Sequence, residues 1–418
     1  MSVRSRYETL ERGQLAVLVP ELLLIGHLID RSAMAWCISA FGREEMTRIA
    51  IDEWMAASPI YTRRMQRALA YEGTDVVTIF KGLQLDIGAP PQFMDFRYTV
   101  HDAWHGEFHL DHCGALMDVE PLGDKYVTSM CHDIEDPTFD ATAVATNPRA
   151  RVRPVHRPPR VPAGRRPHCR WTVAIDDSHP PVEMSPGCED LMKSRAADVE
   201  LSPIDPADDG RGDYGGPLVS DLEFADFSKS ALVRIADEVC LQMHLLNLGF
   251  VRAVGARTDA SQAREICVRQ ATGIAGIAAE RIARALALPA NATGALRVLE
   301  LHPLLNPAAY IPATVGGGEL RIGGRPSPAH DDGAWISLCG PAESRPMAAA
   351  VRAVDPHLEI TYADIPNGSS RLPRNSWIAR VVTSADAATE CDEVAITRIS
   401  TGSSFIFRPR TSIPITPV

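Results

Sequence analysis

Aromatic residues and positive charge are both scarce in this chain of 418 residues. Phe, Trp and Tyr make up 6% of it, and 42 Lys and Arg stand against 53 Asp and Glu, a formal net charge of −11. A general nucleic-acid binder presents a basic face to the phosphates, so this charge balance argues against that class. The length allows two or three domains with ample core.

Motifs of several large enzyme classes are missing. There is no G-x-S-x-G elbow, no G-x-G-x-x-G after a predicted strand and no set of kinase motifs. Their absence argues against hydrolase-fold esterases, dinucleotide-dependent oxidoreductases and phosphotransferases.

A long uninterrupted apolar run and a regular cysteine framework are also missing. The most apolar stretch, 15–29, contains Pro20, Glu21 and His27, so we expect neither a signal peptide nor a membrane-spanning segment. The nine cysteines are an odd number without regular spacing. In a chain of this size they indicate a reducing compartment, and we expect a cytoplasmic protein.

Side chains suited to catalysis are concentrated between Met94 and Asp140. Segments 96–100, 107–119 and 125–132 are rich in β-branched and aromatic residues and are separated by turn sequences, which predicts a three-stranded antiparallel meander. Alternation along the second strand places five residues on one face: His105, Glu107, His109, Asp111 and Cys113. A helix is the alternative, because the histidines at 101, 105, 109 and 112 recur at helical spacing.

The second hairpin of this meander predicts a metal or thiol site. Depending on the register, Cys113 faces either Cys131 or His132, and directly opposed side chains are close enough to share an ion or a proton. With His109, these residues suit zinc best and iron second. Glu107 or Asp133 would then move the proton.

Three other interpretations of the same residues stay open. Without a metal, Cys113 would be the nucleophile, with His132 or His112 taking its proton. An iron site on His105, Glu107 and His109 would instead indicate a non-haem oxidoreductase. The structural alternative is a polar outer sheet face with buried, inert cysteines.

The same stretch resembles a known family. An apolar helical region, then Arg97-Tyr98, then one strand with Cys113 and another with Cys131 and Asp133, is similar to the L-2-amino-thiazoline-4-carboxylic acid hydrolase-like family of bacterial proteins, over roughly 40–140. The resemblance implies hydrolysis of a small ring or amide-like C–N bond at those three positions. The whole chain also resembles uncharacterised actinobacterial proteins of similar length, which implies no chemistry.

The rest of the chain completes an α+β prediction. We expect helices over 14–42 and 43–72, a long helical pair over 228–254 and 260–288, and a small α+β unit in 295–410 with strands at 295–302 and 334–340 among others. The predicted domains are 1–145, with helices packed on the meander, 146–220, an extended arm and acidic linker, and 221–418.

The arm is predicted from composition. Residues 147–171 hold eight arginines and six prolines, and proline at that density opposes regular helix. The arginines suit phosphate or carboxylate groups, as in an acyl-CoA-like ligand. Alternatively the arm packs on an acidic surface of its own chain, such as 189–226, or of a partner subunit, and we expect a homo-oligomer formed through it.

The leading hypothesis is therefore a metal- or thiol-dependent hydrolase acting on a C–N bond of a small molecule. A non-catalytic binding or assembly subunit is the second. The polar turn with His330 and Asp331 is a further candidate for lining a pocket, without an assigned role.

Overall fold

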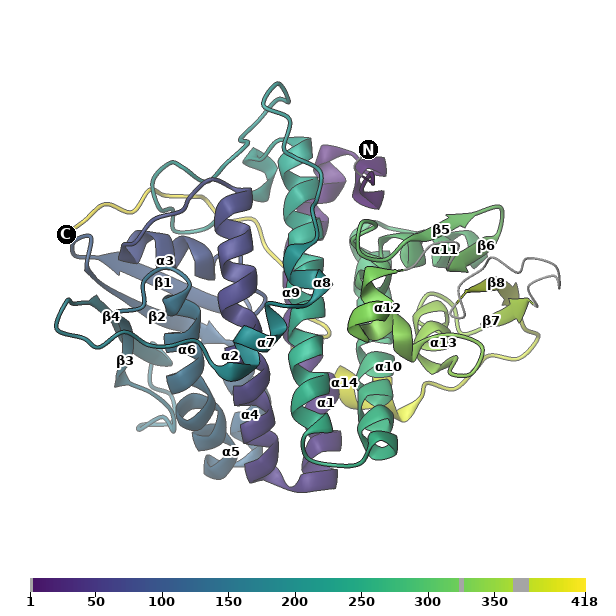
Figure 1. Ribbon diagram of the computed structural model, residues 1–418, viewed down its shortest axis with the longest axis horizontal. Coiled ribbons are helices and arrows are strands. Elements are labelled where there is room, and N and C mark those ends of the chain that lie inside the picture. The colour runs from purple at the N-terminus through teal and green to yellow at the C-terminus, as the bar shows by residue number, and fades with distance from the viewer. Residues whose placement is uncertain (1–2, 323–326, 364–375) are drawn as a thin grey trace.

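Four long helices form the centre of the computed structural model, which describes residues 3–322, 327–363 and 376–418. They are α1 (Arg12–Phe41), α2 (Arg43–Ala68), α9 (Lys229–Gly255) and α10 (Ala260–Ala285). Helix α1 contacts the other three, and α2 packs along α9. The two predicted helical pairs are confirmed, and they form one layer between two β-sheets (Figure 1).

Local sequence explains where these helices begin and how they pack. Ser228 and Asp259 are N-caps whose side chains accept hydrogen bonds from the first turns of α9 and α10. Buried residues cover almost the whole circumference of α1 and α9, as expected for helices surrounded by other elements.

Helix α1 is also, among the described residues, the one helix long and apolar enough in composition to cross a membrane. In this structure 72% of its most apolar window is buried inside the molecule, as in the core helix of a globular protein.

The first sheet lies beside α2 and has the strand order β1-β2-β4-β3, antiparallel throughout. Its strands are β1 (Met94–Val100), β2 (His105–Cys113), β3 (Ala150–His156) and β4 (Cys169–Ile175). Helices α3 (Val76–Leu83) and α6 (Glu135–Val144) contact it, and α6 in turn contacts α2. The strand prediction for the histidine-rich segment is confirmed over 105–113, and the helical alternative is wrong there.

The predicted third strand, 125–132, is wrong. After Cys113 the chain becomes helical, through α4 (Gly114–Val119), the 3-10 turn η2 (Glu120–Leu122), α5 (Asp124–Thr128) and the π-helical turn η3 (Ser129–Ile134). Strand β4 takes the place beside β2 instead. Pairing between segments distant in sequence overrides weak local strand preference.

The proline- and arginine-rich arm contributes to this same sheet. Strand β3 and the start of β4 lie within 147–171, with a loop between them, and Pro154 sits on the edge strand where a missing N–H is tolerated. Four of its arginines pair with carboxylates from 107–140 rather than from the predicted 189–226. The pairs are Arg153–Asp140, Arg157–Asp136, Arg160–Glu120 and Arg170–Glu107.

The second sheet lies on the other side of the helical layer, with the order β5-β6-β8-β7. Its strands are β5 (Ala313–Gly316), β6 (Glu319–Ile322), β7 (Leu358–Ala363) and β8 (Trp377–Thr383). Helices α11 (Ala292–Leu301) and α13 (Arg345–Arg352) contact both this sheet and α10. The predicted small α+β unit is confirmed.

Several strands predicted in this unit are wrong. Residues 292–301 form α11, because Asn291 caps a helix whose buried Ala295, Val298 and Leu299 follow helical spacing. Residues 335–338 form the 3-10 turn η6 (Trp335–Leu338), and α14 (Asp392–Arg398) replaces a further expected strand. The remaining short helices are η1 (Arg6–Thr9), α7 (Pro186–Leu191), α8 (Arg195–Asp198), η4 (Phe224–Asp226), η5 (Pro303–Leu305) and α12 (Pro328–Asp332).

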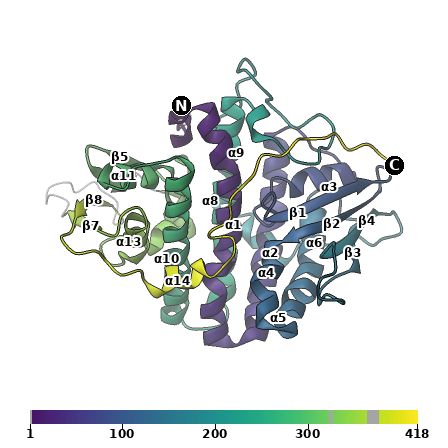
Figure 2. The ribbon, with the colours of Figure 1, turned by 180° about the vertical axis from the view of Figure 1, so that it is seen from behind.

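A C-terminal tail, residues 401–418, runs from α14 across α1 to the first sheet (Figure 2). The fully buried Arg281 of α10 fixes its start by donating hydrogen bonds to the carbonyls of Gly402, Ser403 and Phe405. The same guanidinium pairs with Glu21 of α1 at 2.5 Å.

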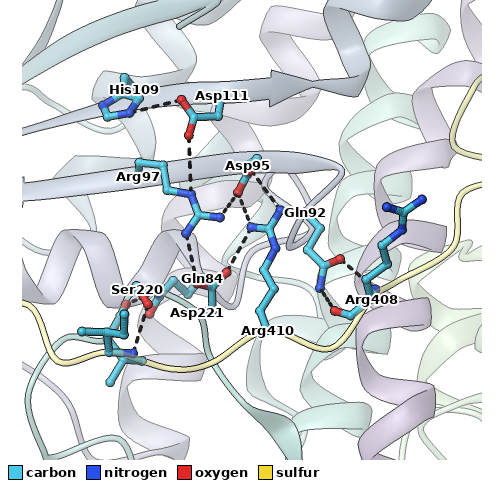
Figure 3. A network of polar contacts seen from close by, with 12 residues as sticks. Gln84, Gln92, Asp95, Arg97, His109, Asp111, Ser220, Asp221, Arg408 and Arg410 are labelled. Atoms are coloured by element: carbon cyan, nitrogen blue, oxygen red, sulfur yellow. Dashed lines mark hydrogen bonds and ion pairs between the residues drawn. The ribbon is translucent and has the colours of Figure 1, made fainter.

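The far part of the tail is held by an ion-pair network on the open side of β1 (Figure 3). Arg410 pairs with Asp95 at 2.6 Å and with Asp221 at 3.1 Å. Arg97 of β1 contacts the same two carboxylates at 2.7 and 3.0 Å. The Val418 amide then donates to the carbonyl of Val100 at 2.8 Å.

Candidate functional site

Strand β2 carries the predicted polar residues on its solvent face, but each has its own partner. Glu107 pairs with Arg170 and lies 3.4 Å from His101, whereas His109 lies 3.4 Å from Asp111. His105 pairs with Asp102 instead. The proposed iron ligands His105, Glu107 and His109 therefore share a face as predicted, but they point to separate contacts.

Cys113 does not share this face. Between the pairs Phe96–Leu110 and Met94–Cys113, β2 carries one residue more than β1, so the alternation of side chains shifts by one. Cys113 therefore turns into the core, where it is 4% exposed. Its Sγ accepts a hydrogen bond from the Leu116 amide at 3.3 Å and caps α4.

Cys131 is near Cys113, although it lies on η3 and not on a strand. Both thiols are buried, and the charge of the nearby Glu135 acts on both of them. Burial raises the pKa of Cys113 to about 12 and that of Cys131 well above its ordinary value. Both are therefore protonated and unreactive at neutral pH.

His132 and Asp133 diverge from the two thiols. The Nε2 atom of His132 lies 2.7 Å from the Pro158 carbonyl, and Asp133 is exposed. Across 3–322, 327–363 and 376–418, no three His, Cys, Asp or Glu side chains are grouped so that they could hold a metal ion. The predicted zinc ligands His109, Cys113, Cys131 and His132 are not brought together, and zinc or iron stays a prediction.

A hollow lined by ionisable residues lies in the layer beneath this stretch. It has a volume of about 110 Å³ and is walled by α1, α2, the α3–β1 connection, β1, η3 and α6. We call it the polar hollow, after five residues in its wall: His27, Asp30, Arg31, Asp86 and Glu135. Buried carboxyl groups converging on one cavity are typical of an acid–base site.

Two buried carboxyl groups on neighbouring helices interact at one side of the polar hollow. Asp30 of α1 accepts a hydrogen bond from the Trp54 indole at 2.8 Å, and its charge acts on Glu53 of α2. Burial, followed by the charge of Asp30, raises the pKa of Glu53 well above its usual value. Glu53 is therefore the protonated partner, since two charges this close do not both persist in a low-dielectric interior.

Asp86 occupies the other side, in the connection after α3. It accepts hydrogen bonds from the Tyr61 hydroxyl at 3.0 Å and from the Gly88 amide at 2.7 Å. Burial raises the pKa of Asp86 to about 6, and these two hydrogen bonds limit the rise because they favour the ionised form. Gly26 of α1 allows the close approach, because a Cβ there would lie 2.4 Å from the side chain of Ile87.

Glu135 enters the wall where η3 continues into α6. Burial raises its pKa to about 8, while the nearby Arg157 lowers it. Burial also lowers the pKa of His27 to about 3, so this imidazole is neutral, and neither of its ring nitrogens has a hydrogen-bond partner in the described chain. At pH 7 the hollow thus combines a protonated acid, Glu135, with an ionised Asp86.

A second hollow adjoins the first and is lined mainly by aliphatic residues. Its volume is about 280 Å³, and it shares Arg31, Met34, Met130 and Ile134 with the polar hollow. We call it the apolar hollow. Six of its lining residues are Ile38, Met46, Val119, Leu122, Ile396 and Ile399.

None of the five residues that define the polar hollow is among the predicted site residues, which lie on β2 and η3 instead. The available signal was an ionisable side chain inside an apolar helical or connecting segment, as at His27, Asp30 and Asp86. The polar turn with His330 and Asp331 forms α12, away from the residues that line either hollow.

Comparison with known proteins adds no assignment. No protein-family model matches the chain, and no curated protein and no solved structure matches it. The family resemblance of 40–140 therefore stays a prediction.

Proposed function

We propose that the protein is a hydrolase that cleaves a C–N bond of a small molecule held in the polar hollow. The observation that carries this proposal is the pairing of a neutral carboxylic acid with an ionised one in a single cavity. The pKa of Glu135 is raised to about 8 and that of Asp86 to about 6. Such separation of two carboxyl pKa values assigns acid and base roles at neutral pH.

The reaction uses water as the nucleophile. Asp86 takes a proton from the water as its oxygen bonds to the carbonyl or ring carbon. Glu135 gives its proton to the nitrogen as the C–N bond breaks, which yields a carboxyl product and an amine. The proton on Asp86 then returns to Glu135 through solvent, so the protein ends unchanged.

Neighbouring groups assist without forming a covalent intermediate. Arg31, held by Asp118 at 3.5 Å, is the cation in the wall and suits the oxygen that gains negative charge. The neutral His27 supplies a hydrogen bond for substrate orientation. Cys113 holds the start of α4 and is not required as a nucleophile, since its pKa of about 12 leaves it protonated.

Release of ammonia or amine from a panel of small amides and cyclic ureas tests this function. Glu135→Gln and Asp86→Asn should each reduce kcat by at least about 100-fold. Glu72→Gln is the matched control, because Glu72 is an exposed carboxylate in the connection between α2 and α3. This variant should retain full activity. Full activity in both hollow variants would overturn the proposal.

An assembly role through the arm is the second candidate, favoured by two exposed valines. Val155 and Val161 have 54% and 79% of their surface exposed. Since residues of the arm form β3, a point change is a better test than deletion. Val161→Asp should convert an oligomer to a monomer in light scattering, and an unchanged mass would remove this candidate.

A further inference from the structure

We propose that the substrate of the polar hollow is amphipathic, with an unbranched alkyl or acyl chain that occupies the apolar hollow. This inference rests on the proposed function, because it takes the polar hollow as the place where the C–N bond is cleaved. It adds the substrate class: a simple aliphatic amide or a related acyl derivative with a hydrocarbon tail.

The two hollows meet at one cluster of side chains. The Arg31 guanidinium lies 3.4 Å from the sulfur of Met34 and 3.9 Å from that of Met130, and all three residues line both hollows. Methionine side chains are flexible and adapt to apolar ligands. A ligand crossing this border would keep its polar group beside Arg31 and place its tail against the methionines.

Asp118 holds Arg31 at the border between the two hollows. The Nε atom of Arg31 pairs with Asp118, whose carboxylate accepts hydrogen bonds from the Ser400 hydroxyl at 2.5 Å and the Thr401 amide at 2.8 Å. The cation is therefore positioned by a chain segment that also lines the apolar hollow. The polar end of a ligand is thereby directed inward and the tail outward.

The wall of the apolar hollow favours hydrocarbon over a sugar or a peptide. The hydroxyls of Ser129 and Ser400 already form hydrogen bonds, with Arg43 and Asp118. The remaining wall is mostly aliphatic, so a polar ligand would lose hydrogen bonds to water without replacement. Each methylene group, in contrast, gains by leaving water.

Two exposed apolar side chains mark the outer end of the apolar hollow. Leu122 is 59% exposed and Ile399 is 81% exposed, and both line it. They come from η2 and from the turn after α14, where the next residues, Ser400 and Thr401, hold Asp118. A chain longer than the hollow would leave between them.

Binding of a homologous series of primary amides, from acetamide to octanamide, tests this inference by titration calorimetry. We expect the affinity to rise about fourfold per added methylene until the apolar hollow is full. Ala35→Phe fills part of that hollow and should abolish the dependence on chain length. Ala40→Phe, exposed near the end of the same helix, is the matched control and should preserve it.

Ile399→Asp provides a variant at a surface position that does not depend on core packing. It should weaken octanamide binding at least tenfold and leave acetamide binding unchanged. Affinity independent of chain length in the wild-type protein would overturn the inference, even if short amides are hydrolysed. Binding that depends on chain length without hydrolysis of any amide would uphold it and overturn the proposed function.

Discussion

The indole nitrogen of Trp54 on α2 donates a hydrogen bond to the Asp30 carboxylate of α1 at 2.8 Å. This pair joins the two helices that wall one side of the polar hollow. Burial also raises the pKa values of Asp30 and of its neighbour Glu53, so this side of the hollow binds protons more readily than free carboxyl groups would.

The activity should have a bell-shaped pH profile. Asp86 is ionised above about pH 6 and Glu135 is protonated below about pH 8, so kcat/KM should be highest between these values. Glu135→Gln should remove the alkaline limb along with most of the rate, and Asp86→Asn the acidic limb. A profile that is flat from pH 5 to pH 9 would contradict both roles.

The stability of the protein should fall as the pH rises, through Glu135. Its folded pKa of about 8 exceeds the ordinary value of 4.5, so the folded state binds the proton more tightly than the unfolded state. The neutral acid therefore favours folding fully below pH 4.5, and this contribution decreases up to about pH 8. Glu135→Gln should have a Tm higher than wild type by a few degrees at pH 8 and not at pH 4.5.

Replacement of Cys113 distinguishes a structural from a nucleophilic thiol. Cys113→Ser keeps an acceptor at the start of α4 and should retain activity, whereas Cys113→Ala should lose about 1 kcal/mol of stability with the cap. Urea unfolding and amide hydrolysis measure the two effects. Complete inactivity of a folded Cys113→Ser protein would restore the thiol mechanism.

Arg281 should be a major contributor to stability. Arg281→Met leaves Glu21 without its partner in the interior and releases the carbonyls of the tail, at a cost of about 3–5 kcal/mol. The double variant with Glu21→Gln should recover a large part of that loss. Chemical unfolding of the four combinations gives the coupling directly, and additive losses would show that the pair is not linked.

Local sequence patterns were sufficient for the four long helices and for β1 and β2. Their periodicity is strong, and the turn between the two strands is short. The third strand was missed because a loop and several helices separate β4 from β2 in the sequence. No pattern within 169–175 indicates which strand this segment pairs with. The shifted pairing near Cys113 could not be predicted from the sequence either, yet it decides which face of the sheet that thiol occupies.

The site was harder to predict than the fold for a similar reason. Asp30, Asp86 and Glu135 lie in separate elements and meet only through tertiary packing. Asp30 and Asp86 interrupt apolar segments, but nothing in the sequence indicates that these residues meet one another or Glu135. The residues of the histidine-rich strand are close in sequence, whereas the polar hollow is lined by segments more than a hundred positions apart.

The C-terminal tail connects α14 and α10 with the first sheet, which lies on the other side of the helical layer. It leaves α14, passes the buried guanidinium of Arg281 and finishes against the backbone of Val100 in β1. The tail therefore links the first sheet to α10, which packs against the helices of the second sheet. Heating should accordingly melt both sheets in one calorimetric peak, and a proteolytic nick within 404–412 should split that peak into two.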